Sequence, residues 1–324
     1  MEKRKILILD PFSDESVEKI KKIIKEEFFV KVINNYSEEE LLLEMKDAEI
    51  IIGEPSIKLL QNKNENCPRL KFIQMTWSGV DIYTRNSLPF PKDKIILANA
   101  RGAYGMIISQ FVIGMIISLM LNFKQYHNQQ QEKIWKRGGS IKSLEKAKVL
   151  IFGAGDIGTY CAKRLKGFDA YCIGVCKDVN KKREYFDEVC SLDEAIKHFS
   201  EVDVVIGAIP SNKETERYFD KIKLNMLKKG SIIVNVGRGN FIDCSSLDEL
   251  LKPRHLWGAA LDVTDPDPLP QIHPLWSNPY CMITPHASGI TFGHLKETEE
   301  LVCEVVMTNL LRYCNNEEII NSVF

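Results

Sequence analysis

The sequence lacks the features that mark several large classes of protein. Its 43 basic and 44 acidic residues leave a formal net charge of -1, so no overall field attracts nucleic acid or an anionic membrane. It contains no low-complexity tract, no block of like charge and no internal repeat. No HxxxH or Cys/His spacing suggests a metal site, so we expect no metal. The expected partner is a small molecule.

The nine cysteines form no CxxC pair and follow no regular spacing. Several lie inside apolar runs, as Cys172 does in AYCIGVC, where a free thiol behaves as a small hydrophobic side chain. This usage favours a reducing compartment. The apolar stretch after MEKRK is short and ends at Asp10 without a cleavage site, which argues against a secretion signal. We therefore expect a cytoplasmic protein.

The longest apolar run, Met106 to Phe123, resembles a membrane span in length but contains Ser109, Gln110 and Asn122. A helix that is apolar on nearly all sides can equally be buried between domains or subunits. Because no other segment looks membranous, we expect a buried helix and assign Gln110 no chemistry.

A chain of 324 residues exceeds the usual size of one core, so two domains are expected. Apolar runs alternate with charged helical stretches, a pattern that predicts parallel sheets covered on both faces. The fold class is therefore α/β, with two Rossmann-like, doubly wound parallel sheets. The first series of strands is expected at Ile6–Leu9, Val30–Ile33, Ile50–Ile52, Phe72–Met75 and Ile95–Ala98. The second is expected at Lys148–Phe152, Ala170–Val175, Val204–Ala208, Ile232–Val236, Ala259–Val263 and Met282–Thr284.

The segment KVLIFGAGDIG places Gly153, Gly155 and Gly158 between a strand and a helical pattern. In a dinucleotide-binding loop the first glycine allows a tight turn and the second lets the backbone approach a pyrophosphate. The third lets helix and strand pack closely, and the helix N-terminus faces the phosphates. The alternative is a glycine-rich turn that only packs a helix. The flanking strand and helix favour the cofactor site.

Cofactor choice depends on the end of the second strand, which reads Cys176, Lys177, Asp178. An acid at the first of these positions would bind both ribose hydroxyls of NAD, whereas a neutral residue followed by a base accommodates the 2′-phosphate of NADP. The residues slightly favour NADP over NAD. Asp178 turned toward the ribose would reverse that preference.

Three further segments place a polar residue just beyond an apolar strand, where open α/β sheets bind ligands. Arg238 lies in IIVNVGRGNFID, His286 in CMITPHASGIT, and Asp262, Asp265 and Asp267 in LDVTDPDPLPQIHPLW. Together with GAGDIG and LKFIQMTWSGVD, these segments resemble those of the D-isomer-specific 2-hydroxyacid dehydrogenases, over almost the whole chain. That family includes glyoxylate and hydroxypyruvate reductases, D-lactate dehydrogenases and phosphoglycerate dehydrogenases.

The resemblance implies hydride transfer between NAD(P)H and the carbonyl of a small 2-oxo acid, giving a D-2-hydroxy acid. It implies a cofactor domain, residues 101–286, inserted into a substrate domain of residues 1–100 plus 287–324. It also implies a homodimer formed through the cofactor domains by the long helix after residue 100. Glyoxylate or hydroxypyruvate is the expected substrate. The alternatives are a phosphoglycerate dehydrogenase and, from another class, an NAD(H)-sensing corepressor-like binding protein.

The resemblance also assigns a role to each site residue. His286 would be the general acid that protonates the carbonyl oxygen, a role that suits imidazole near neutral pH. Arg238 would bind the substrate carboxylate with two parallel hydrogen bonds, a geometry that lysine lacks. The remaining substrate contacts would come from Trp77, which narrows the site, and from the backbone amides of Ser78, Gly79 and Val80. The cofactor contacts would be Gly153, Gly155, Asp156, Ile157, Gly158, Cys176, Lys177, Asp178, Ile209, Pro210, Val236, Gly237, Asp262 and His286, with Asp262 on the nicotinamide carboxamide.

Asp267 departs from the family pattern, which usually has glutamate there, hydrogen-bonded to the catalytic histidine. A carboxylate beside His286 fixes its tautomer, whichever acid supplies it. Because aspartate is one methylene shorter, either the loop lies closer to His286, or a water bridges the pair, or the coupling is weaker. Asp265 is a poorer substitute because its register does not match.

Overall fold

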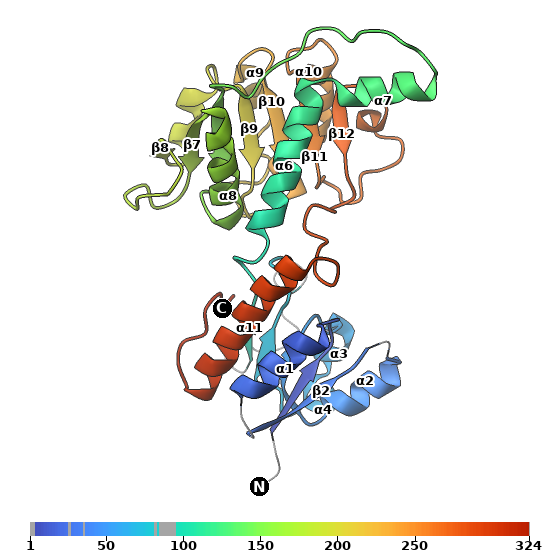
Figure 1. The fold of residues 1–324 in the computed structure, drawn as a ribbon, viewed down its shortest axis with the longest axis vertical. Helices are drawn as coiled ribbons and strands as arrows, with labels where there is room; N and C mark the ends of the chain where they lie inside the picture. The colour runs from blue at the N-terminus through green and yellow to red at the C-terminus, as the bar shows by residue number, and fades with distance from the viewer. Residues whose placement is uncertain (1–3, 25–26, 35, 81–82, 84–94, 324) are drawn as a thin grey trace. The chain divides into compact units, whose positions relative to one another are not determined.

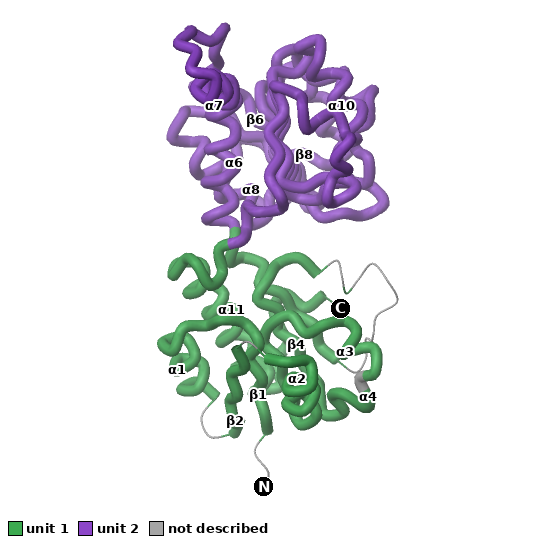
Figure 2. Tube along the Cα trace, turned by 90° about the vertical axis from the view of Figure 1, so that its right-hand side faces the viewer, with its two compact units in different colours: residues 1–104, 291–324 green, residues 105–290 purple. Residues whose placement is uncertain are grey.

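The computed structural model describes residues 4–24, 27–34, 36–80, 83 and 95–323. The chain forms two compact units, shown in different colours in Figure 2. Unit 1 comprises residues 1–104 and 291–324, and unit 2 comprises residues 105–290. Among the residues that the structure describes, each unit contains one β-sheet in which all neighbouring strands pair in parallel. The predicted fold class is confirmed.

The sheet of unit 1 has the strand order β2-β1-β3-β4-β5. Its strands are β1 (Arg4–Ile8), β2 (Phe28–Val32), β3 (Ala48–Ile52), β4 (Phe72–Gln74) and β5 (Ile96–Ala98). Its helices include α1 (Asp14–Ile23), α2 (Glu38–Met45), α3 (Ile57–Gln61), α4 (Lys63–Asn66) and α11 (Lys296–Cys314).

Both faces of this sheet are buried, which explains why its strands are continuous apolar runs. Leu7, Ile51 and Ile73 point to one face, where they form a core with Leu41 of α2 and Leu60 of α3. The other face is covered by α1 and α11, which pack against each other although they come from opposite ends of the chain (Figure 1).

The sheet of unit 2 has the strand order β12-β11-β10-β9-β6-β7-β8. Its strands are β6 (Lys148–Phe152), β7 (Tyr171–Val175), β8 (Glu188–Cys190), β9 (Val204–Gly207), β10 (Ile232–Asn235), β11 (Gly258–Leu261) and β12 (Cys281–Ile283). Its α-helices are α6 (Gly105–Met120), α7 (Phe123–Gln131), α8 (Asp156–Leu165), α9 (Lys221–Met226) and α10 (Cys244–Leu251), and short 3-10 turns lie at Lys166–Phe168, Glu194–His198, Gly239–Phe241 and Pro274–Trp276. The edge strand β8 was not predicted, because three residues are too few to show a strand pattern.

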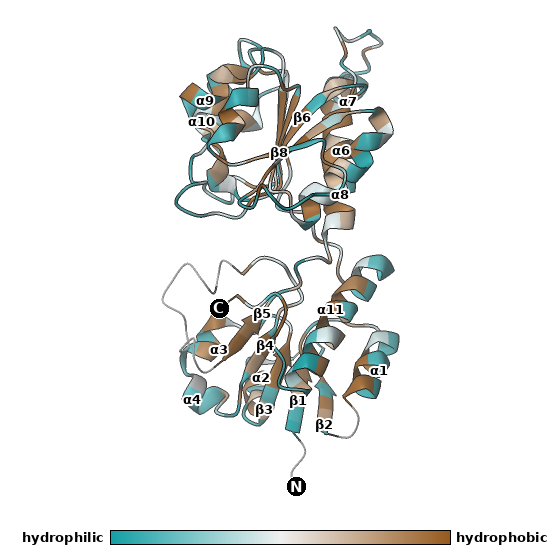
Figure 3. Cartoon of the chain, turned by 90° about the vertical axis from the view of Figure 1, so that its left-hand side faces the viewer, coloured by the Kyte–Doolittle hydropathy of each residue, from teal (hydrophilic) through white to brown (hydrophobic). Residues whose placement is uncertain are grey.

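The helices of unit 2 lie on both sides of its sheet, with α6 and α8 on one face and α9 and α10 on the other (Figure 3). Phe152, the last residue of β6, packs edge-on against Tyr218, Phe219 and Phe241, with ring centroids 5.2–5.3 Å apart. This aromatic cluster supports the strand end from which the glycine-rich loop starts.

The apolar run Met106 to Phe123 forms most of α6, which packs against α8 and buries Ile108, Val112 and Ile116. Within the described ranges no single helix is long and apolar enough to cross a membrane. In the part of the chain that the structure describes, α6 and α7 taken together reach the necessary length and composition, but the two helices are bent by 69° relative to each other. The segment therefore serves as a packed helix of unit 2, as predicted.

Candidate active site

The polar residues singled out in the sequence follow strands at the carboxyl edge of the unit 2 sheet. Arg238 follows β10, Asp262 follows β11 and His286 follows β12, and these three strands are neighbours. The glycine-rich loop follows β6, where the strand order changes direction between β9 and β7. In doubly wound sheets this edge, and this switch point in particular, is where ligands bind.

The glycine-rich loop has the geometry that a dinucleotide requires. Gly153 has a φ of +100°, and a Cβ on it would lie 2.3 Å from the carbonyl oxygen of Ala208. A Cβ on Gly158 would lie 2.0 Å from the carbonyl oxygen of Gly153, so helix α8 packs closely on the loop. At Gly155, no described atom lies within 4 Å of such a Cβ. The space beside Gly155 at the N-terminus of α8 is therefore open, as the close approach of a pyrophosphate would require.

Ile209 and Gly237 also approach closely, because a Cβ on Gly237 would lie 2.7 Å from the carbonyl oxygen of Ile209. This contact brings Ile209–Pro210, after β9, against Val236–Gly237, after β10, beside the glycine-rich loop. The predicted cofactor contacts on these two segments therefore lie next to each other, at the carboxyl ends of neighbouring strands.

The end of β7 presents no carboxylate at the position of Cys176. The thiol of Cys176 donates to the carbonyl oxygen of Asp178 at 3.3 Å, and the Asp178 carboxylate accepts from the backbone N–H of Asn180 at 3.1 Å. Asp178 therefore closes its own turn. The same loop carries Lys177 and Arg183, and the Nε of Arg183 is a buried atom without a hydrogen-bond partner among the described residues. Sequence reasoning missed Arg183, although it stands in the basic run KKR.

His286 and Asp267 meet directly. Nδ1 of His286 lies 3.2 Å from Oδ2 of Asp267, and the two side chains are 57% and 45% exposed. Of the three arrangements left open by the shorter aspartate side chain, the structure has the loop close enough for a direct contact. A Cβ on Gly239 would lie 1.8 Å from the carbonyl oxygen of Thr264, so the loop carrying Arg238 packs on the segment that carries Asp267. The Arg238 guanidinium itself donates to the carbonyl oxygen of Gly237 at 2.8 Å.

The Asp262 side chain hydrogen-bonds to the loop that carries His286. Its Oδ1 accepts from the Thr284 hydroxyl at 2.7 Å and from the Ala287 N–H at 2.8 Å, and its Oδ2 accepts from the Ser288 N–H at 3.1 Å. His286 adopts a φ of +54°, and its N–H bonds to the Asp262 carbonyl oxygen at 2.8 Å. The Asp262 side chain, in a residue only 2% exposed, thus stabilises an unfavourable backbone conformation at His286. Sequence reasoning missed this role because it depends on hydrogen bonds between residues 22 to 26 positions apart.

In unit 1 the segment Trp77–Val80 follows β4 at the carboxyl edge of that sheet. The Trp77 ring stacks on Tyr104 at a centroid distance of 5.8 Å. The carbonyl oxygen of Trp77 accepts from Ala100 N–H at 3.0 Å, and that of Ser78 accepts from the Asn99 amide at 2.9 Å. These contacts hold the loop that the sequence assigned to the substrate carboxylate.

Two carboxyl groups that sequence reasoning did not single out lie beside this loop. The Thr76 hydroxyl donates to the Asp10 carboxylate, and a Cβ on Gly53 would lie 3.0 Å from Cγ of Asp10. Burial raises the pKa of Asp10, and burial together with the nearby Asp10 charge raises the pKa of Glu54. The available signal was that Asp10 directly follows a predicted strand and that Glu54 follows another after Gly53.

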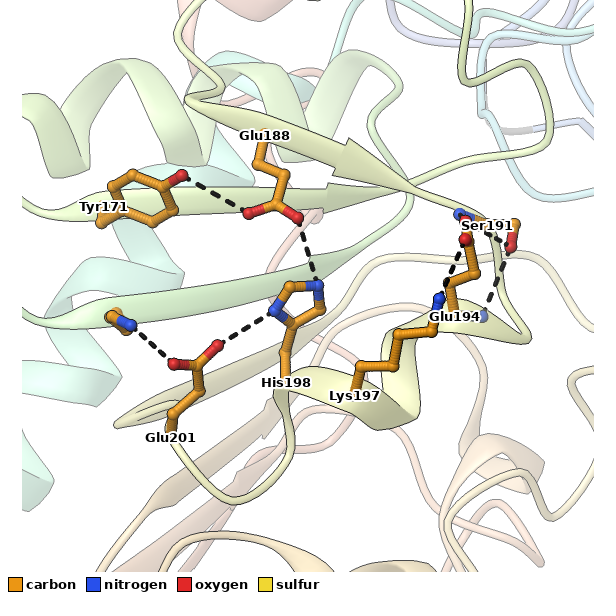
Figure 4. Close-up of polar contacts among 8 residues, drawn as sticks. Tyr171, Glu188, Ser191, Glu194, Lys197, His198 and Glu201 are labelled. Carbon is orange, nitrogen blue, oxygen red and sulfur yellow. Dashed lines mark hydrogen bonds and ion pairs between the residues drawn. The ribbon is translucent and has the colours of Figure 1, made fainter.

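His198, the other histidine that bonds to carboxylates, lies elsewhere. Its ring nitrogens lie 3.4 Å from Glu188 and 3.1 Å from Glu201 (Figure 4). Glu188 begins β8 and Tyr171 begins β7, so this network occupies the amino-terminal edge of the sheet, away from the strand ends that carry His286. It consolidates the fold. Among the described residues, no group of three or more His, Cys, Asp or Glu side chains could hold a metal ion.

Comparisons with known proteins agree with this geometry. A family model described as "D-isomer specific 2-hydroxyacid dehydrogenase, NAD binding domain" matches residues 113–288. The chain is 28% identical over 319 residues to D-3-phosphoglycerate dehydrogenase of Methanocaldococcus jannaschii, covering 98% of this chain and 59% of that protein. It is 27% identical over 313 residues to glyoxylate reductase of Pyrococcus furiosus, covering 91% of this chain and 89% of that one. A crystal structure of a D-isomer specific 2-hydroxyacid dehydrogenase family protein from Aeromonas salmonicida aligns with a TM-score of 0.85 at 27% identity, over 100% of this chain and 99% of that one.

Proposed function

Because the chain belongs to the D-isomer specific 2-hydroxyacid dehydrogenase family, we propose that Arg238, His286 and Asp267 form the catalytic group of a reductase of small 2-oxo acids. The protein is an NAD(P)-dependent oxidoreductase. The observation that carries the proposal is the 3.2 Å contact between Nδ1 of His286 and Oδ2 of Asp267, on the strand edge that also presents Arg238. Nothing in the comparisons supports the corepressor alternative.

The nicotinamide cofactor, when bound, supplies the hydride. In the proposed mechanism Asp267 accepts a hydrogen bond from Nδ1–H of the protonated His286 imidazole, and Nε2–H delivers its proton to the carbonyl oxygen as the alcohol forms, which leaves the imidazole neutral. Arg238 binds the substrate carboxylate and polarises the adjacent carbonyl. We assign unit 2, which carries the glycine-rich loop, as the cofactor domain, and the backbone amides of Ser78–Val80 as further groups that would bind a substrate carboxylate. D-stereochemistry of the product follows from the family.

For the cofactor, we favour NADP. The ribose position at Cys176 offers no carboxylate, and the Asp178 carboxylate is engaged in its own turn. We assign Lys177 and Arg183, which follow Cys176 in the same loop, as the cations that would pair with a 2′-phosphate. NAD would instead require an acid that bonds both ribose hydroxyls.

For the substrate, we favour glyoxylate or hydroxypyruvate over a phosphorylated 2-oxo acid. Asp10 bonds to Thr76, the residue before Trp77, and Glu54 follows Gly53 at the next strand end. Two acidic side chains beside the proposed carboxylate loop repel a second anionic group on the substrate. This charge pattern disfavours the phosphoglycerate dehydrogenase alternative.

We further propose a homodimer in the cytoplasm. All nine cysteines are free thiols, as in a reducing compartment. Large apolar side chains on α7 and the segment after it are exposed, including Phe123 at 50%, Ile141 at 63% and Trp135, whose side chain is fully open to solvent. A second copy of the chain is the expected cover for such a surface.

The test is a kinetic panel of glyoxylate, hydroxypyruvate, pyruvate and 3-phosphohydroxypyruvate with both NADPH and NADH. We expect the highest kcat/KM for glyoxylate or hydroxypyruvate with NADPH. His286→Gln should lower kcat by about 100-fold or more, whereas His294→Gln, at an exposed residue of unit 1, serves as the matched control and should leave kcat unchanged. Turnover of every 2-oxo acid at the level of the His286→Gln variant would refute the proposal.

A further inference from the structure

The chain first passes from unit 1 to unit 2 at the peptide bond between Tyr104 and Gly105, and both residues are anchored within their own unit. On the unit 1 side, the Tyr104 hydroxyl donates to the carbonyl oxygen of Thr76 at 2.7 Å. The Tyr104 ring, only 3% exposed, stacks on Trp77 with an interplanar angle of 17°. Tyr104 is thus attached to the loop that we assign to the substrate carboxylate.

On the unit 2 side, Gly105 is attached to the glycine-rich loop. Its backbone N–H donates to Oδ2 of Asp156 at 2.7 Å. A Cβ on residue 105 would lie 2.5 Å from Oδ1 of Asp156, so any larger residue would displace the carboxylate. Position 105 requires glycine because there is no space for a Cβ beside Asp156. The backbone conformation does not require it, because the φ of Gly105 is not in the left-handed region.

Asp156 lies where two helices begin. It is the first residue of α8, whose N-cap, Gly155, has no side chain to satisfy the helix N–H groups. Its carboxylate also holds Gly105, the first residue of the 16-residue helix α6. One negative charge therefore serves the positive ends of both helices.

We propose that Asp156 is a positioning residue that couples occupancy of the cofactor site to the substrate-binding loop. The inference rests on the proposed function, because it takes the pyrophosphate to bind at the N-terminus of α8. A pyrophosphate there repels the Asp156 carboxylate and drives it onto Gly105. The hydrogen bond from the Gly105 N–H to Asp156 is thereby strengthened. Because Tyr104 is joined to Gly105 by a peptide bond, the contacts of Tyr104 with Thr76 and Trp77 are fixed at the same time. Cofactor binding thereby prepares the substrate loop across a single peptide bond.

The experiment measures this coupling directly. The dissociation constant of oxamate, a stable analogue of a small 2-oxo acid, is determined by calorimetry with and without saturating NADP+, and the ratio of the two values is the coupling factor. We expect a factor of about 5 or more in the unmodified protein. Asp156→Ala and Gly105→Ala should each bring the factor close to 1, while NADP+ still binds.

A variant and a control separate coupling from loss of structure. Asp156→Asn keeps an oxygen for the Gly105 N–H but removes the charge, so it should bind NADP+ about threefold to tenfold more tightly and lose most of the coupling. Asp220→Ala removes the corresponding cap of α9, where Asp220 accepts from Lys223 N–H at 2.8 Å, and should keep the coupling factor of the unmodified protein. An unchanged factor in Asp156→Asn, or an equal loss in Asp220→Ala, overturns the inference. Failure of the unmodified protein to bind either nicotinamide dinucleotide would instead refute the proposed function itself.

Discussion

Replacing Asp262 with asparagine is the sharpest test of how the His286 loop is built. The isosteric amide has one accepting oxygen, whereas the carboxylate accepts from two backbone N–H groups on different oxygens, those of Ala287 and Ser288. Whichever way the amide is turned, its NH2 group faces one backbone N–H. The Thr284 hydroxyl can rotate to accept, but a backbone N–H cannot. The substitution therefore leaves one donor unsatisfied at a residue that is 2% exposed.

The expected cost follows from that count. A buried donor without an acceptor costs about 1–3 kcal/mol, so unit 2 should unfold at a lower temperature. His286 has a φ of +54°, and without the full set of bonds the loop can relax toward a commoner backbone conformation. A displacement of the imidazole by about 1 Å would lower the rate by on the order of 100-fold. Asp262→Ala, which removes all three acceptor contacts, should be more severe in both respects.

The assay compares kcat/KM for glyoxylate reduction with the thermal unfolding midpoint. Asp243→Asn is the matched control, because the partly buried Asp243 of unit 2 also accepts two hydrogen bonds, from the Ser245 N–H and the Ser246 hydroxyl at the start of α10. No contact of Asp243 with the His286 loop is found among the described residues. We expect Asp243→Asn to lower stability without a comparable loss of kcat/KM. An Asp262→Asn protein with unchanged kcat/KM would show that the loop does not depend on these bonds.

Three more predictions follow from individual contacts. Asp267→Asn should lower kcat by at least about tenfold, because the amide no longer stabilises the protonated imidazole of His286; an unchanged rate with glyoxylate would remove Asp267 from the mechanism. Burial raises the pKa of Asp10, so native stability falls as pH rises from about 4 through that raised value. Asp10→Asn should therefore raise the unfolding midpoint at about pH 7 and not at about pH 4, and an equal shift at both would contradict the assignment. Lys177→Ala should raise KM for NADPH at least about threefold more than KM for NADH, whereas the exposed Lys229→Ala should change neither, and equal effects on both cofactors would argue against a 2′-phosphate contact.

Most strands could be predicted from local sequence patterns, and where a predicted element differs from the observed one, the cause is also local. Lys148–Phe152 forms β6 with the bounds that were expected, because a buried parallel strand is an uninterrupted apolar run bounded by polar residues. The edge strand Glu188–Cys190 was missed because an edge strand of three residues needs little apolar character. The predicted helix from Met106 to Phe123 ends sooner, at Met120, since Asn122 adopts a left-handed backbone conformation there.

The residue types that form the candidate site could also be recognised from the sequence. Glycines between a strand and a helix, and single polar residues after apolar strands, are local features that do not depend on knowing the neighbours of each strand. By itself, therefore, the sequence determined the α/β class, the position of the glycine-rich loop and the choice of Arg238 and His286 as candidates. No local pattern indicated the hydrogen-bond partner of each of these side chains. The pairing of His286 with Asp267, the use of the Asp262 carboxylate and the attachment of Gly105 to Asp156 were decided only by the tertiary structure. The physical reason is that strand order and close approach bring together atoms separated by 19 to 51 residues, and hydrogen bonds form only at contact distance.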